Sequence, residues 1–173
     1  MYFKKATLDD IDTIIDILSD GRNQLAEAGV NQWQGDYPSR NQITEDIMGG
    51  SAYLFNEDDN ATVGAVAVVP SPDTTYDTAK ATWLNTTEPY RVIHRVAIHS
   101  SKAGHGYATQ LFEKMIDHII RRHPDIKSIR IDTHADNLPM QHLIAKMGFE
   151  RVGEMVGVYH QDDVCYVYEK LIK

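Results

Sequence analysis

Two glycines between an apolar run and a helical pattern are the residues best placed to do chemistry. Within the segment from Val92 to Met115, a strand-like run is followed by Gly104 and Gly106, and a helix is predicted to begin near Tyr107. Glycine allows a tight turn and close approach of a ligand, and free N–H groups at a helix N-terminus attract anions. The spacing indicates a main-chain cradle for phosphate, with Lys102 as an added positive charge; a purely structural turn is the alternative.

This glycine spacing differs from the two common nucleotide-binding motifs. A P-loop places Gly-Lys-Ser/Thr at the start of its helix, and a dinucleotide fingerprint has a third glycine where this chain has Thr109. The short sequence Gly-His-Gly-Tyr-Ala, which contains His105 and ends at Ala108, instead suits a diphosphate held by backbone amides. A nucleotide-binding protein is therefore a disfavoured hypothesis.

The chain resembles the GCN5-related N-acetyltransferases in two motifs that occur in the expected order. Their acyl-CoA motif, Gln/Arg-x-x-Gly-x-Gly/Ala after a strand, aligns with residues Ser101–Gly106. Their downstream pattern, an asparagine followed by a leucine and a Gly-Phe pair, aligns with Asn137, Leu143 and Gly148–Phe149. The resemblance covers essentially the whole chain. It implies direct transfer of an acetyl group from acetyl-CoA to an amine of a small molecule or peptide.

The resemblance also implies which residues bind acetyl-CoA. In the family, the strand before the first motif splays from its neighbour, so its backbone groups pair with the pantetheine arm and polarise the acyl carbonyl. The residues expected to contact the coenzyme are Val96, Ala97, Ile98, Lys102, Gly104, His105, Gly106, Tyr107, Ala108, Asn137 and Gln141. The motif begins with Ser101 rather than Gln or Arg, and Ala103 replaces a frequent Arg. Diphosphate binding should therefore depend mainly on backbone amides.

Acetyl transfer to an amine requires a base, and His94 is the first candidate. A histidine has a reference pKa of about 6.5, which suits proton transfer near neutrality. A period of two places His94 on the same strand face as Val96 and Ile98. A hydrogen-bonded core histidine is the competing interpretation, and Glu88 in the preceding loop is a rival base.

The departing thiolate needs a proton, and the donor usual in the family is missing. Many relatives have a tyrosine where this chain has Ile144. The remaining candidates lie near the C-terminus, with water as a fallback: Tyr159, Tyr166 and Tyr168, of which Tyr168 is taken as the acid. Transfer is expected without a covalent intermediate, because Cys165 has no evident activating partner. The missing tyrosine also permits another function, a non-catalytic acyl-CoA-binding or regulatory module of the same fold.

An aromatic pair is expected to contact the acceptor. Trp33 and Tyr37 lie in the turn-rich segment 29–38, which the resemblance places over the acceptor site. They are predicted to form one wall of the acceptor pocket, with His94 or Glu88 opposite. Packing of the loop against the core is the alternative interpretation.

Composition restricts the remaining functions. The 173 residues carry a formal charge of −8, the wrong sign for nucleic-acid binding, and no apolar run approaches the ~20 residues that span a bilayer. The eight histidines lack metal-ligand spacing, so no metal is expected. A single cysteine and the absence of a signal peptide favour a cytoplasmic location. An amine metabolite or peptide is the expected partner, and a homodimer is a candidate assembly.

The elements that must position these residues alternate between strands and helices. The predicted strands are 2–7, 52–55, 62–69, 92–98, 128–133, 150–155 and 164–171, and the predicted helices are 8–25, 39–48, 107–122 and 138–147. Residues 70–90 show no period and are predicted to form a long loop. The order indicates a single α/β domain over residues 1–173. The resemblance implies an acyl-CoA N-acyltransferase fold, with a mixed, mostly antiparallel sheet, flanking helices and a splayed central strand pair.

Overall fold

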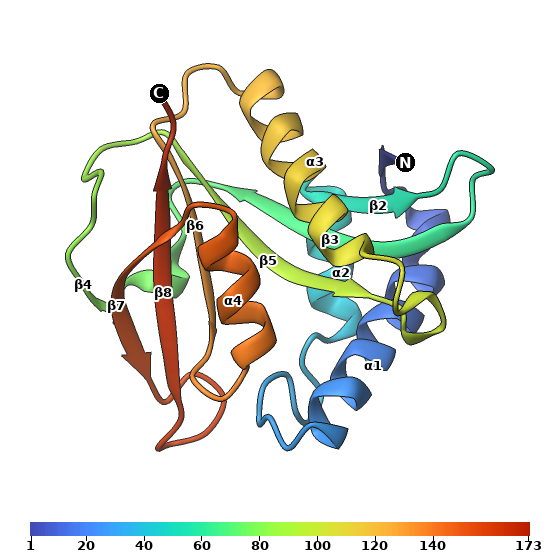
Figure 1. Ribbon diagram of the computed structural model, residues 1–173, viewed down its shortest axis with the longest axis horizontal. Helices are drawn as coiled ribbons and strands as arrows, with labels where there is room; N and C mark the ends of the chain where they lie inside the picture. The colour runs from blue at the N-terminus through green and yellow to red at the C-terminus, as the bar shows by residue number, and fades with distance from the viewer.

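In the computed structural model, residues 1–173 build an eight-stranded mixed sheet with helices on both faces (Figure 1). The strand order is β1-β2-β3-β5-β6-β8-β7-β4, and only the β5–β6 pair is parallel. The strands are β1 (Tyr2–Lys5), β2 (Ala52–Asn56), β3 (Thr62–Pro70), β4 (Lys80–Ala81), β5 (Tyr90–Ile98), β6 (Ser128–His134), β7 (Glu150–Val156) and β8 (Val164–Leu171). This arrangement confirms the predicted fold class.

Four helices form the two outer layers. They are α1 (Ile11–Glu27), α2 (Arg40–Met48), α3 (Tyr107–Arg122) and α4 (Leu138–Lys146). The apolar stripe of α3 predicted from the sequence is buried in one core cluster, which also holds Ile144 of α4, whereas α1 and α2 pack on a second cluster across the sheet. Side chains fix two helix starts, because Ser39 accepts a hydrogen bond from Gln42 N and Asn137 accepts one from Met140 N. None of the four is both long and apolar enough to cross a membrane.

The central strands separate halfway along their length. β5 pairs with β6 only from Tyr90 to Ile93, opposite Ser128 to Ile131. Beyond that point β5 stays paired with β3 as far as Ile98, and β6 stays paired with β8. The predicted splay is confirmed, and it leaves one edge of β5 without a neighbouring strand. Gly64 of β3 lets β5 approach here, because a Cβ at that position would lie 2.7 Å from Ala97 O.

A bulge in β5 overturns the predicted face of His94. His94 pairs with Ala67, whereas Ala97 pairs with Ala65, so β5 has one extra residue between these two pairs. Arg95 lies in this bulge and has a left-handed φ of 49°. His94 therefore shares a face with Ala97, on the side of α1, and Val96 and Ile98 face the opposite core. The simple period of two fails because a bulge inverts the alternation after it.

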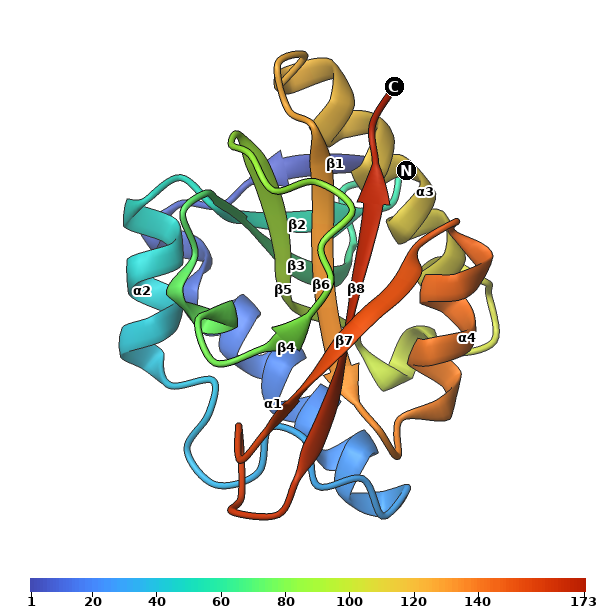
Figure 2. The ribbon, with the colours of Figure 1, turned by 90° about the vertical axis from the view of Figure 1, so that its left-hand side faces the viewer.

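Residues 70–90, predicted as a loop, contain more structure than their sequence indicates. A short 3₁₀ turn spans 74–76, and β4 pairs with β7 at the edge of the sheet (Figure 2). The carboxylate of Glu169, buried in β8, accepts hydrogen bonds from the N–H groups of Leu84 and Asn85, at 2.6 and 3.3 Å. These long-range contacts hold the segment against the sheet. No periodic pattern in the local sequence indicates them.

Candidate active site

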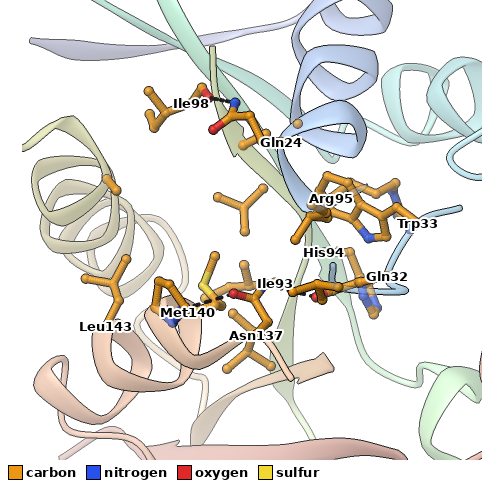
Figure 3. A pocket seen from close by; sticks show the side chains of 18 of the residues that line it. Gln24, Gln32, Trp33, Ile93, His94, Arg95, Ile98, Asn137, Met140 and Leu143 are labelled. Carbon is orange, nitrogen blue, oxygen red and sulfur yellow. Dashed lines mark hydrogen bonds between the residues drawn. The ribbon is translucent and has the colours of Figure 1, made fainter. Parts of the chain in front are cut away.

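A cavity of about 420 Å³ opens where β5 and β6 part (Figure 3). Its walls come from α1, the α1–α2 loop, β5, α3, β6, α4 and the β7–β8 loop. Five of the residues predicted to bind the coenzyme line it: Val96, Ala97, Ile98, Ala108 and Asn137. Both residues predicted to bind the acceptor, Trp33 and Tyr37, and the predicted base His94 line it as well. The splay therefore brings both groups of predicted residues to one space.

One end of the cavity, which we call the donor end, adjoins the turn before α3. Gly104 and Gly106 both have left-handed φ values, 81° and 70°, and a Cβ on either would meet open space. None of the N–H groups from Gly104 to Thr109 donates a hydrogen bond within the protein. The turn therefore presents free backbone donors at the positive end of a helix, as an anion site requires. His105 lies exposed on this turn.

Two predicted coenzyme contacts of the donor end are engaged with Glu57 from the β2–β3 turn. The Lys102 ammonium lies 2.6 Å from Glu57 Oε2, and the Tyr107 hydroxyl donates to Oε1. The hydrogen bonds from Lys102 and Tyr107 lower the pKa of Glu57, so this carboxylate is ionised at neutral pH. Its charge offsets that of Lys102, which leaves the backbone amides as the main anion donors of the turn.

Amide side chains line the middle of the cavity. Gln24 Nε2 donates to Ile98 O at 3.0 Å, on the free edge of β5 (Figure 3). Asn137 Nδ2 donates to Gln32 Oε1 at 3.0 Å, which ties the α1–α2 loop to the start of α4. Gln141, predicted to bind the coenzyme, does not line the cavity; its side chain donates to Ala135 O at 2.6 Å and holds the turn before α4.

The other end of the cavity, the acceptor end, holds a histidine paired with an aspartate. His94 Nε2 lies 2.7 Å from Asp73 Oδ2, and both side chains are largely buried. Burial raises the pKa of Asp73, but the hydrogen bond and charge of His94 and the bonds from Thr75 outweigh it and hold that pKa well below the usual value. The ionised Asp73 accepts a hydrogen bond from the Nε2–H group of His94, so in the neutral ring Nδ1 carries the free lone pair.

A second carboxylate stands beside this pair. Asp132 of β6 lines the cavity, and its Oδ1 accepts a hydrogen bond from Tyr76 at 3.0 Å. Burial raises the pKa of Asp132, while the positive charge of His94 and the Tyr76 bond oppose that effect. Arg95 does not neutralise Asp132, because its guanidinium binds Asp46 through two hydrogen bonds, one of 2.7 Å.

Aromatic side chains close the acceptor end. The rings of Tyr37 and Tyr159 lie 6.0 Å apart, and the Tyr37 hydroxyl accepts a 2.9 Å hydrogen bond from Arg95. Trp33 is buried in the cluster under α1 and also lines the cavity. The two interpretations of Trp33 are thus compatible, since one face of a side chain packs while another borders the cavity.

The other predicted catalytic residues lie elsewhere. Tyr168 is packed in the core cluster under α3 and does not line the cavity, and Glu88 is exposed before the start of β5. Of the three tyrosines considered as the acid, Tyr159 lines the cavity, from the loop between β7 and β8. Ile144 is fully buried, so the usual position of the family's acid is part of the core. Cys165 is fully buried too, and burial raises its pKa to about 12.

Comparison with known proteins decides the family. The model of the acetyltransferase (GNAT) family matches residues 20–149, which include the splayed strands and the turn before α3. The chain belongs to the GNAT family of acetyltransferases. The first motif, Ser101–Gly106, and the second motif, around Asn137, both fall within the matched residues.

Individual relatives agree with this GNAT assignment. The chain is 25% identical over 162 residues to the uncharacterized N-acetyltransferase YesJ of Bacillus subtilis, covering 92% of this chain and 87% of that protein. An acetyltransferase of the GNAT family from Streptococcus agalactiae has a TM-score of 0.84 at 30% identity, over 99% of this chain and 95% of that one. The NatC complex bound to a Gag peptide and CoA shares the fold, with a TM-score of 0.68 at 16% identity, over 99% and 98% of the two chains.

Sequence reasoning missed the acidic residues of the acceptor end. Asp73 belongs to a segment without periodicity, and nothing local links it to His94. Asp132 did have a signal, because it is a charged residue in a strand that begins Ser-Ile-Arg-Ile and ends close to the second motif. No group of three or more His, Cys, Asp or Glu side chains could hold a metal ion.

Proposed function

We propose that this GNAT acetyltransferase transfers the acetyl group of acetyl-CoA directly to an amine, with His94 as the base. The observation that carries the proposal is a single cavity that joins the open edge of β5 to the His94–Asp73 pair. A thioester on the free edge and an amine at His94 would then meet within one cavity.

The donor end suits coenzyme A in two respects. The free N–H groups of residues 104–109 supply donors for the diphosphate, and the unpaired edge of β5 supplies backbone groups for the amides of the pantetheine arm. Asn137 lines the same passage and holds its side-chain amide toward Gln32. The NatC complex, which has this fold, was solved with CoA bound.

Each step of the transfer can be assigned to atoms. The amine nitrogen attacks the thioester carbonyl carbon, a C–N bond forms and the C–S bond breaks, and the sulfur leaves as a thiolate. His94 Nδ1 takes the proton that the nitrogen loses, and Asp73 stabilises the resulting imidazolium. We assign protonation of the thiolate to Tyr159, the one candidate acid that lines the cavity; burial raises its pKa, so its hydroxyl carries a proton at neutral pH.

Calorimetry and thiol release test the proposal together. We expect both CoA and acetyl-CoA to bind, and an amine panel to give thiol release matched by a product one acetyl group heavier. Binding without release from any amine would contradict catalysis and favour an acyl-CoA-binding module. The absence of heat with either coenzyme, for folded protein, would overturn the donor site as well.

A further inference from the structure

Asp132 is the one acidic residue that lines the cavity, and only one of its two carboxylate oxygens accepts a hydrogen bond from the protein. Its Oδ1 accepts the Tyr76 hydroxyl, and no group of the protein donates to Oδ2. Oδ2 is accessible and not buried, so it is open to the cavity that Asp132 lines. A carboxylate with one free oxygen at the end of a cavity is a site for a hydrogen-bond donor carried by a ligand.

The charged groups around Asp132 indicate that the hydrogen-bond donor of the ligand is a cation. Among the residues that line the cavity, only Asp132 carries a carboxylate, and His94 and Arg95 are the only bases. Both bases already have partners, since Arg95 binds Asp46 and His94 binds Asp73. The acceptor end therefore has a carboxylate that neither base binds directly, and it has no free cation that could receive the carboxylate of a ligand.

The neighbouring side chains fit the same ligand. Tyr37 and Tyr159 approach each other at 6.0 Å, and Trp33 borders the same end of the cavity. Aromatic faces attract ammonium groups and pack against alkyl chains. An alkyl or arylalkyl ammonium thus finds both a carboxylate and aromatic surface, whereas the carboxylate of an α-amino acid would lie close to that of Asp132.

From these contacts we propose that the acceptor is a small amine without a carboxylate, of the kind formed by decarboxylation of an amino acid, and that Asp132 binds its ammonium group. The inference rests on the proposed function for the reaction itself. Asp132 binds the amine as it enters in its charged form. The ammonium loses one proton to water before the nitrogen can attack, and His94 takes the second proton as the C–N bond forms and the C–S bond breaks. An amino acid places a second negative charge beside Asp132, where nothing compensates it.

Two matched pairs of acceptors test the proposal, agmatine with arginine and tyramine with tyrosine, because the only primary amine of each amino acid lies next to its carboxylate. We expect kcat/KM for the best amine to exceed that of its amino acid by about 100-fold or more, because like charges brought together at a buried site cost several kcal/mol. Equal rates within a pair, or preference for the amino acid, would overturn the proposal.

Asp132→Asn supplies the second arm. It removes the charge at constant size, so we expect lower kcat/KM for the amine and a ratio between amine and amino acid that falls by about 10-fold or more. A merely structural role would slow both acceptors and leave the ratio unchanged, which would overturn the proposal. Asp136→Asn, an exposed change on the same segment, is the control and should preserve the ratio.

Direct binding separates this inference from the proposed function. Calorimetry of agmatine and arginine on the CoA-loaded protein measures the same preference without turnover. If agmatine binds and arginine does not, while no acceptor is acetylated, the proposed reaction fails and the ammonium site stands. If acetylation proceeds without the preference, the reaction stands and the site is overturned.

Discussion

The two ends of the cavity present different kinds of binding group. The donor end is main chain: free N–H groups from Gly104 to Thr109 and the open edge of β5. The acceptor end is side chain: Asp73, His94 and Asp132, with aromatic rings around them. Backbone groups offer the same donors whatever the side chains are, so the donor end is suited to a shared coenzyme. The acceptor end can differ between proteins of one fold, because each of its groups depends on residue type.

If the two ends are independent, a change at one end should leave binding at the other intact. The largest effect is expected for His94→Gln, which removes the proposed base. We expect kcat to fall by about 100- to 10,000-fold, the range for loss of a positioned general base. The dissociation constant for CoA should stay within about 2-fold of the wild-type value, because His94 lies at the other end and on the opposite face from Val96 and Ile98. Single-turnover kinetics and calorimetry measure the two quantities, with the exposed His142→Gln as control. A small loss of rate would remove His94 from the reaction.

The reciprocal change is Gly106→Val at the donor end. A β-branched residue is strained at a φ of 70°, and its side chain would stand beside the free N–H groups. We expect CoA affinity to fall by about 10- to 100-fold, since each hydrogen bond to a charged group is worth about 1.5–3 kcal/mol. Gly29→Val has a comparable φ of 74° and open space around it, so it controls for backbone strain alone. Equal CoA affinity in the two variants, measured by calorimetry, would contradict the anion cradle.

A smaller effect is expected for Asp73→Asn, which keeps the shape of the pair and removes its charge. The amide oxygen can still accept a hydrogen bond from Nε2–H of His94, but it carries no charge to stabilise the imidazolium, so kcat should fall by about 10-fold. Thermal unfolding provides a second measure. The pKa of Asp73 is lowered in the folded state, so its ionised form stabilises the fold above pH ~4 and this contribution is lost as the pH falls. The difference in Tm between wild type and variant should therefore shrink between pH 6 and pH 3. A constant difference would contradict the ion pair.

The smallest effect is expected for a substitution of Trp33, at the acceptor end. Trp33→Phe keeps an aromatic ring in the cluster under α1 and shortens the surface that borders the cavity. We expect the KM for the amine to rise by about 3-fold, because a part of one aromatic contact is lost. CoA affinity should change little. An unchanged KM would show that Trp33 acts only in packing.

Most of the fold could be predicted from the sequence, as helix α3 illustrates. Its apolar spacing, its glycine start and its end at His123-Pro124 are local signals, and the structure has α3 at Tyr107–Arg122. β4 could not be predicted, because a two-residue strand has no period and depends on its pairing with β7. The face of His94 was predicted wrongly for a related reason. The bulge at Arg95 is stabilised by Asp46 from α2, and no pattern within β5 records that contact.

By itself, the sequence determined the glycine turn and the helix start of the donor end of this GNAT protein, because glycine conformations and helix starts depend on neighbours along the chain. The tertiary structure decided the acceptor end. Asp46, Asp73 and Asp132 come from separate segments, and they acquire meaning only when folding sets Arg95, His94 and Tyr76 beside them. Which carboxylates are paired with a base, and which one is left open to a ligand, depends on distances in space that no spacing along the chain encodes.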